Sequence, residues 1–134
     1  MSISTDAILV FGFEIGVEND GDPPDFLNGN SFEEFVVGLS GVTLSEDYAV
    51  ACEQTKELMS ECPAELVRHC SDEYSMYILA VRGTVSLANR GYPAEIDLEK
   101  LDIHPDQIYD LENWCEANNI PYEKPKWLLC SFCG

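Results

Sequence analysis

The segment AELVRHCSDEYSMYILAVRG (residues 64–83) decides the fold, because it contains the pattern of a β-hairpin. Residues 64–71 and 75–83 are rich in β-branched, aromatic and other apolar side chains, which favour strands. The sequence SDEYS (71–75), where the two runs meet, is polar, as expected of a turn that joins two paired strands. The stretch TVSLANRG (84–91) follows directly and predicts a third strand.

Two more strands are expected nearer the ends of the sequence. The segment AILVFGFEI (7–15) is short, apolar and rich in strand-forming residues. It lies between Asp6 and a glycine-rich acidic stretch, so it predicts a first, buried strand. The segment KWLLCSF (126–132) predicts the last strand.

Three segments carry helix signals, and the first follows the acidic stretch. Ser31 can cap a helix, because Glu34 three residues later completes a capping-box pattern. We expect this helix, over residues 32–39, to end at Gly38 or Gly41, where glycine can leave the helical conformation.

The other two helices are expected in the middle and in the last third of the sequence. The second should begin at Thr43 or Ser45 and end before Pro63, because apolar residues recur between them at helical spacing. The third should open at residues 104–105 and stop at Pro121. Its apolar residues then fall on one face: Ile108, Leu111, Trp114 and Cys115.

The length and the order of these elements predict the fold class. The 134 residues, 46% of them apolar, are enough for one domain with its own hydrophobic core. Strands and helices alternate irregularly, which favours the α+β class. We therefore predict a single α+β domain over residues 1–134, with a mainly antiparallel sheet packed with two to three helices. An acidic loop over residues 16–30 is expected, because its prolines and glycines oppose regular structure.

The charge of the chain is strongly negative and unevenly distributed. With 25 acidic and 7 basic residues, the formal net charge is −18. Residues 1–55 contain eleven acids and no base, whereas residues 56–134 contain fourteen acids and all seven bases. Nucleic acids and anionic membranes would repel such a protein, so we expect direct binding to neither. A basic signal region and an apolar run of membrane-spanning length are both missing, so a cytoplasmic location is expected.

The acidic loop does not match a calcium-binding loop. Such a loop needs oxygen ligands at alternate positions, a glycine at the sixth position and a bidentate glutamate at the twelfth. If Glu18 takes the first position, Pro23 falls where the glycine belongs and Gly29 where the glutamate belongs. If Asp20 takes the first position, Pro24 falls at a ligand position. The loop is then either a solvated connection or a surface for a partner.

Cys130 and Cys133 have the two-residue spacing of a zinc-binding pair, and His69 and Cys70 are the other candidate ligands. Adjacent strand residues point to opposite faces, so His69 and Cys70 are not expected to share a metal. In an extended strand Cys130 and Cys133 also diverge. We predict no metal and no cofactor, with Cys130 and Cys133 as the alternative metal ligands, and we expect reduced, mostly buried cysteine thiols.

The sequence contains no catalytic motif. A nucleophile elbow, a zinc-protease helix and a glycine-rich phosphate loop are all missing. Of the two histidines, His69 could meet a distant cysteine through the fold, and His104 is expected to be a surface or capping residue. Neighbouring carboxylates such as Glu33 and Glu34 splay apart on a helix and do not form an acid–base pair. We therefore predict that the protein is not an enzyme.

Several aromatic side chains could be taken for a platform that stacks on nucleic-acid bases: Trp114, Trp127, Tyr74, Tyr77, Tyr92 and Phe132. Such a platform also needs basic residues among the aromatic rings to hold the phosphates. Because these basic residues are lacking, we expect the aromatic side chains to belong to the core.

Three blocks of the sequence resemble a group of small acidic proteins of unknown function from tailed bacteriophages. The blocks are MSISTDAILVFGF (1–13), ELVRHCSDEYSMYILAV (65–81) with RGYP shortly after it, and KWLLCSFCG (126–134). The resemblance implies a phage gene product that works in the cytoplasm of a bacterial host. It brings no activity, cofactor or catalytic residue. Small acidic phage proteins are often inhibitors of host nucleic-acid machinery.

Charge and resemblance together predict an inhibitor of a bacterial nucleic-acid-binding defence complex, of the anti-CRISPR or anti-restriction type. Its carboxylates would mimic DNA phosphates and attract a basic bacterial protein or complex. Alternatives are an inhibitor of host gyrase or RNA polymerase, and a zinc- or thiol-dependent interaction module. The predicted partner-binding residues are Glu14, Glu18, Asp20, Asp22, Asp25, Glu33, Glu34, Glu46 and Asp47.

Overall fold

The predicted hairpin is present and forms one side of the sheet. In the computed structural model, β2 (Ala64–Ser71) pairs antiparallel with β3 (Ser75–Val81), in a register that joins Ala64 to Val81 and Cys70 to Ser75. The structure describes residues 5–133, so the first four residues of the block MSISTDAILVFGF and the final glycine lie outside it.

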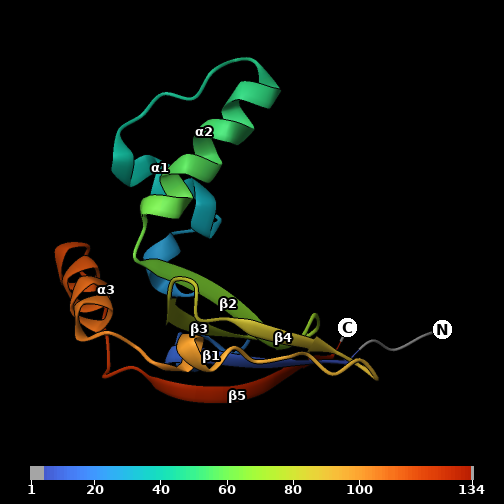
Figure 1. Cartoon of the computed structure of the whole chain (residues 1–134). Helices are drawn as coiled ribbons and strands as arrows, with labels where there is room; N and C mark the ends of the chain where they lie inside the picture. Colours follow the sequence, from blue (N-terminus) through green and yellow to red (C-terminus); the bar gives the residue numbers. More distant parts are fainter. Residues whose placement is uncertain (1–4, 134) are drawn as a thin grey trace.

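The first strand, β1 (Thr5–Ile15), has partners on both of its edges (Figure 1). Along one edge it pairs antiparallel with β5 (Lys126–Cys133), from Thr5 opposite Cys133 to Gly12 opposite Lys126. Along the other edge it pairs first with β4 (Ser86–Asn89) and then, from Gly12 onward, with β3. The predicted third strand is therefore real but shorter than expected, and its partner is β1.

The sheet closes on itself through a short parallel ladder between β2 and β5. Cys70 pairs with Phe132 and Ser71 with Cys133, so β1, β3, β2 and β5 are joined in a ring. All the other ladders are antiparallel. The prediction of an α+β fold with a mainly antiparallel sheet is confirmed.

Two hydrophobic clusters lie on the two faces of this curved sheet. One, which we call the inner cluster, has no helix residue among its described members: Ile8, Val10, Ile78 and Ala80, with Val67, Leu128, Cys130 and Phe132 around them. The other joins the outer face of the sheet to the helices through Phe13, Leu79, Leu111 and Cys115. Burial on both faces explains why β1 is apolar over nearly its whole length.

The third helix, α3 (Pro105–Ala117), begins where the sequence predicted. The ring nitrogen Nδ1 of His104 accepts a hydrogen bond from the backbone N–H of Asp106, and Pro105 occupies the first helical position. Leu111 and Cys115 are fully buried against the sheet. A 3-10 turn (Leu98–Leu101) comes before the helix, in the segment that joins it to β4.

The first helix, α1 (Phe32–Ser40), carries the predicted capping box. The Ser31 hydroxyl accepts from the Glu34 N–H, and the Glu34 carboxylate accepts from the Ser31 N–H, both at 3.1 Å. Its lower part is held by aromatic contacts, since the rings of Phe32 and Phe35 each lie 6.1 Å from the ring of Trp114 on α3. The helix ends at Gly41, which is one of the two ends that the sequence predicted.

The second helix, α2 (Tyr48–Glu61), does not begin at Thr43 or Ser45 as predicted. Asp47 is its N-cap, because the Asp47 carboxylate accepts hydrogen bonds from the backbone N–H groups of the second and third residues after it. The Ser45 hydroxyl accepts from the Asp47 N–H instead and forms the turn before the helix.

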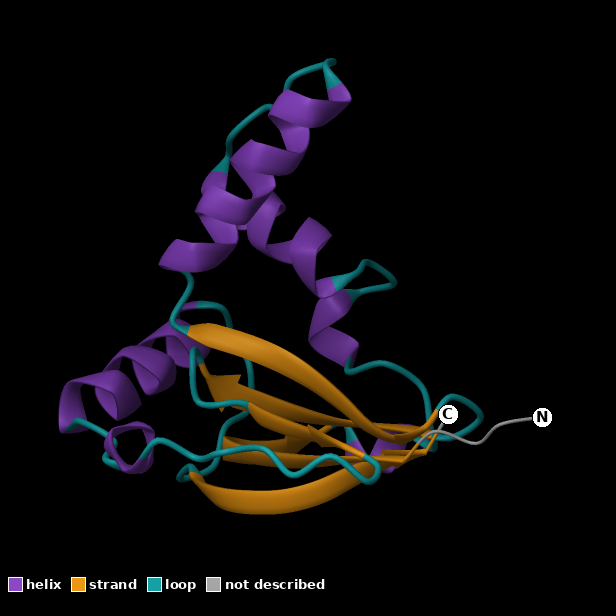
Figure 2. Ribbon diagram, turned by 45° about the vertical axis from the view of Figure 1, so that its right-hand side comes forward, coloured by secondary structure: helices purple, strands orange, loops and turns teal. Residues whose placement is uncertain are grey.

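Helices α1 and α2 and the loop between them form an arm, residues 32–61, that stands away from the sheet. Figures 1 and 2 show the arm projecting from the end of the sheet where α2 leads into β2, with its tip at the loop between the helices. None of the fourteen residues of α2 is buried. Within residues 5–133, no helix combines the length and apolar character needed to cross a membrane.

The aromatic prediction is correct for some residues and wrong for others. Trp114 and Trp127 pack against the outer cluster and Phe132 against the inner one. Tyr74 and Tyr92 are exposed, by 43% and 75%. Both lie in turns, where a phenol ring can stay in water while the backbone reverses direction.

Candidate functional site

The acidic loop, residues 16–30, folds into two short 3-10 turns. They span Val17–Asn19 and Asp25–Leu27, and Pro24 and Leu27 are buried beneath them. The side-chain amide of Asn19 donates to the Pro23 carbonyl at 3.0 Å and to the Asp25 carboxylate at 3.1 Å. These contacts hold the loop in one conformation although it contains no strand or α-helix.

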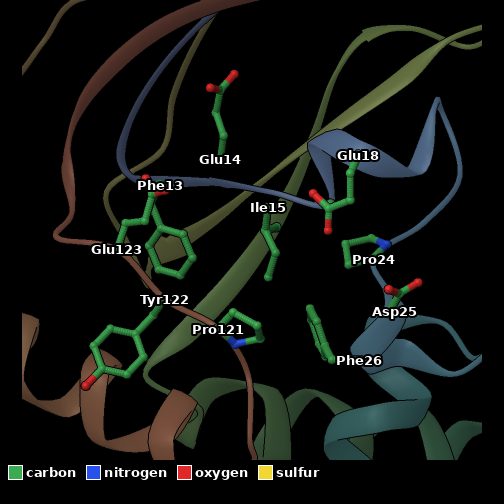
Figure 3. A pocket seen from close by; sticks show the side chains of 11 residues that line it. Phe13, Glu14, Ile15, Glu18, Pro24, Asp25, Phe26, Pro121, Tyr122 and Glu123 are labelled. Atoms are coloured by element: carbon green, nitrogen blue, oxygen red, sulfur yellow. The ribbon is translucent and has the colours of Figure 1, made fainter.

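The loop forms one wall of a cleft of about 340 Å³ at the end of β1. The other walls come from the end of β1 and from residues 121–123, which connect α3 to β5. Figure 3 shows the side chains of Phe13, Ile15, Phe26 and Pro121 pointing toward the middle of the cleft. The cleft therefore has an apolar floor made by segments that are far apart in the sequence.

The lining of this cleft includes four carboxylates and, within the described part of the chain, no Lys or Arg: Glu14, Glu18, Asp25 and Glu123. Figure 3 shows that they do not all point inward. Glu18 reaches from the loop toward Ile15, whereas Glu14 extends from the opposite side of β1. The result is an apolar pocket with an acidic rim, which suits a cationic side chain with an aliphatic stem.

Glu14 acts electrostatically on the other side of β1, where Cys130 packs against the inner cluster. Its charge raises the pKa of the Cys130 thiol, which burial already raises, and partly opposes the effect of burial on His69. Burial lowers the pKa of His69, which is only 7% exposed. The Nε2 atom of His69 is buried without a hydrogen-bond partner in the described structure. His69 is thus a neutral core side chain at neutral pH.

All nine predicted partner-binding carboxylates are exposed, and they fall into two groups. One group lies on the end of β1 and the acidic loop: Glu14, Glu18, Asp20, Asp22 and Asp25. The other lies on the arm: Glu33 and Glu34 at its base, and Glu46 and Asp47 at its tip. Of the first group, Glu14, Glu18 and Asp25 line the cleft, whereas Asp20 and Asp22 lie elsewhere on the acidic loop. The second group is spread along the arm.

Some of these carboxylates also have structural roles. Glu34 and Asp47 cap helices, and Asp20 accepts a hydrogen bond from the Tyr74 hydroxyl at 3.1 Å. A carboxylate that is already hydrogen-bonded is less free to reorient toward a partner. Glu18 and Asp22 have no such bond within the described residues, and they are the better candidates for direct contacts.

Glu123 belongs to the cleft but was missed by the sequence prediction. It lies in the segment YEK, which has no local feature that distinguishes it from a surface loop. Its position next to Phe13 follows from the pairing of β5 with β1, which places residues 121–123 beside the end of β1. Only knowledge of that pairing could have identified it.

The cysteines do not form a metal centre in the described structure. Cys130 is half-buried against the inner cluster, whereas Cys133 is exposed on the other face of β5, and no group of three or more His, Cys, Asp or Glu within residues 5–133 is placed to hold a metal. All six cysteines are free, but only Cys62 and Cys115 are fully buried, fewer than expected. Burial raises the pKa of Cys115 to about 12, so its thiol stays protonated at neutral pH.

Comparison with known proteins found no relative of the chain: no family model, no curated protein and no solved structure matches it.

Proposed function

We propose that the protein binds a basic, nucleic-acid-binding bacterial protein or complex and blocks its nucleic-acid site. The observation that carries the proposal is the cleft at the end of β1, whose lining combines an apolar floor with four carboxylates and, among the described residues, contains no Lys or Arg. Carboxylates that the rest of the fold does not neutralise attract Lys and Arg side chains, and the apolar floor accommodates their aliphatic stems.

The electrostatics of the whole chain support the same proposal. A net charge of −18 steers a basic partner toward the protein and keeps nucleic acid away from it. A Lys- or Arg-lined channel that normally holds DNA phosphates would accept the carboxylates of the acidic loop in their place. Binding should then be fast and should weaken strongly as the salt concentration rises.

The class of partner follows from the resemblance to phage proteins described above. We propose a defence complex, of CRISPR or restriction type, in the cytoplasm of a bacterial host, since such complexes expose basic channels for the DNA backbone. Host gyrase or RNA polymerase, which also hold DNA in basic channels, is the alternative partner. The proposed role is that of an inhibitor and not of an enzyme.

The proposal is tested by reversing charges that are free of structural bonds. The double variant Glu18→Lys and Asp22→Lys changes the loop, and Glu95→Lys with Glu99→Lys makes the same charge change on the exposed connection before α3. Each protein is immobilised and exposed to bacterial lysate, with and without excess duplex DNA. Circular dichroism and thermal unfolding first confirm that both variants are folded.

The expected result is capture of a nucleic-acid-binding protein by the native chain and by the control variant but not by the loop variant. Duplex DNA in excess should displace the captured protein. If the loop variant captures the same protein as the native chain, or if DNA does not compete, the proposed mimicry is wrong.

A further inference from the structure

The cleft at the end of β1 has room for one long side chain. Its volume of about 340 Å³ lies near the lower end of the range of roughly 300–1,000 Å³ that is typical of small-molecule sites. A helix with its side chains is about 10 Å across and does not fit into such a space. The cleft therefore suits a single side chain of a partner, and its chemistry decides which one.

The floor of the cleft is apolar and partly aromatic. Figure 3 shows the side chains of Ile15, Phe26 and Pro121 turned toward the middle of the cleft. Ile15 and Phe26 are only half-buried, so part of each side chain is left for a bound group. A cation that enters this space loses much of its water. The loss costs a strongly hydrated ammonium ion more than a guanidinium group, which is weakly hydrated and packs on aromatic rings.

Carboxylates stand on two sides of this floor. Figure 3 shows Glu18 and Asp25 on the side of the acidic loop and Glu123 on the other side, next to Phe13. The Asn19 side chain donates to one oxygen of Asp25 at 3.1 Å, which holds this carboxylate in place before a partner arrives. A planar guanidinium group has five N–H donors and can contact more than one carboxylate, whereas an ammonium group concentrates its charge at one point.

The lysines nearest to the cleft in the sequence do not fill it. Lys124 and Lys126 follow Glu123, but neither belongs to the lining, and neither forms an ion pair within residues 5–133. Lys126 is the neighbour of Trp127 on β5, so the two side chains lie on opposite faces of the strand. Trp127 packs on the outer cluster, which also contains the cleft residue Phe13. Lys126 therefore lies on the face away from the cleft.

From these features we propose that the cleft binds one arginine side chain of the basic partner, in preference to lysine. The aliphatic stem of the arginine lies on the apolar floor, and its guanidinium group pairs with Glu18 and Asp25. The inference rests on the proposed function, because it names the side chain that enters the same cleft. It goes further, since the proposed function needs only positive charge, which lysine and arginine share. An arginine enclosed in this way is a common anchor of protein interfaces.

The test uses three short synthetic peptides as probes. Each has blocked ends and glycines on both sides of one central residue, which is arginine, lysine or citrulline. Citrulline has nearly the shape of arginine but no charge. Binding to the full chain is followed by the backbone amide and methyl shifts of the ¹⁵N- and ¹³C-labelled protein as the peptide concentration is raised.

The expected result is saturable binding of the arginine peptide, with the largest shifts in residues 13–18, 24–26 and 121–123. The lysine peptide should bind about fivefold more weakly or worse, and the citrulline peptide should give no saturable shift. Glu18→Gln should weaken the arginine peptide about threefold or more. The matched control is Asp22→Asn, which removes a charge from the same loop outside the lining of the cleft and should leave the affinity nearly unchanged.

Three outcomes would overturn the inference: equal affinity for the arginine and lysine peptides, shifts centred outside the cleft, or an equal loss of affinity in Glu18→Gln and Asp22→Asn. Failure of the proposed function gives a different result. If the arginine peptide binds as expected but the loop variant still captures the same protein from lysate, the cleft is an arginine site and the mimicry is wrong. If the peptides are not distinguished but capture depends on the loop charges, the proposed function stands and no arginine enters the cleft.

Discussion

The hydroxyl group of Tyr74 donates a hydrogen bond to the carboxylate of Asp20 at 3.1 Å, which joins the β2–β3 turn to the acidic loop. The ring of Tyr74 also covers Gly21, since a Cβ atom at that glycine would lie 3.3 Å from the ring. Asp20 itself has a positive φ of 54°, a conformation that Asp tolerates better than most residues. A single phenol therefore helps to fix the shape of the loop that lines the cleft.

Replacing Tyr74 by phenylalanine should loosen the acidic loop. The lost hydrogen bond is exposed, so we expect only a small decrease in the free energy of unfolding. Amide hydrogen exchange in residues 16–30 should become faster, while exchange in β2 and β3 changes little. Tyr109→Phe, on an exposed part of α3, is the control, and equal exchange in both variants would show that the hydrogen bond does not hold the loop.

Replacing Gly12 by alanine should destabilise the fold severely. A Cβ atom at Gly12 would lie 2.4 Å from the carbonyl oxygen of Leu79, and backbone on β3 has no freedom to move away. We expect a loss of about 1–3 kcal/mol or more, as for other overpacked cores. Gly38→Ala, inside α1 with open space around it, should instead stabilise by about 0.5–1 kcal/mol. Urea unfolding measures both, and a neutral Gly12 variant would show that β1 and β3 are farther apart.

Replacing Cys70 by glycine should stabilise the protein. Cys70 has a φ of 76°, whereas the other non-glycine residues with positive φ in the described structure are Asp or Asn. The left-handed conformation costs most residues about 1–2 kcal/mol, part of which is offset by the greater freedom of glycine in the unfolded chain. We expect a net gain of up to about 1 kcal/mol in chemical denaturation. Cys70→Val should be destabilising. If the valine variant were more stable than the glycine variant, the backbone at Cys70 would not be strained.

The stability of the protein should decrease in mild acid because of His69. Its pKa is lowered from 6.5 in the folded state, mainly by burial, so below about pH 6.5 the unfolded chain binds a proton that the folded chain does not. The free energy of unfolding should therefore fall as the pH is lowered from 7.5 to 5.5. Above pH 7.5, His69 should contribute no further change with pH.

The variant His69→Leu checks this pH dependence. It should remove the fall between pH 7.5 and 5.5 and, at pH 7.5, should not destabilise, because it also removes the unpartnered Nε2 atom. His104→Asn keeps a side-chain acceptor at the start of α3 and should retain the native pH dependence. A slope that persists in His69→Leu would assign the effect to other groups.

Local features were predicted well because their signals are local. The hairpin follows from two apolar runs and a polar turn, and the capping box of α1 follows from Ser31 and Glu34, three positions apart. The start of α2 was missed because Ser45 and Asp47 are both good N-caps, and the choice between them depends on which side chain reaches the helix backbone.

Long-range features could not be predicted from local patterns. The parallel pairing of Cys70 with Phe132 closes the ring, but no pattern in the sequence around either residue predicts that these two strands pair. The cleft depends on the same kind of contact, because Glu123 reaches Phe13 only through β5. Exposure of the acidic residues was predictable from their charge, but their division between the cleft and the arm was not.

The central place of β1 has a consequence for synthesis of the chain. All of its partners come later: β1 ends at Ile15, whereas the first partner to be made, β3, begins at Ser75. While the intervening residues are being translated, we expect this apolar strand to remain unpaired and prone to associate with other nascent chains. Asp6 and Glu14 lie near the two ends of this strand, and the acidic loop follows at once. Charges beside an apolar strand oppose its association with other chains, so we expect them to limit aggregation of the unfinished chain.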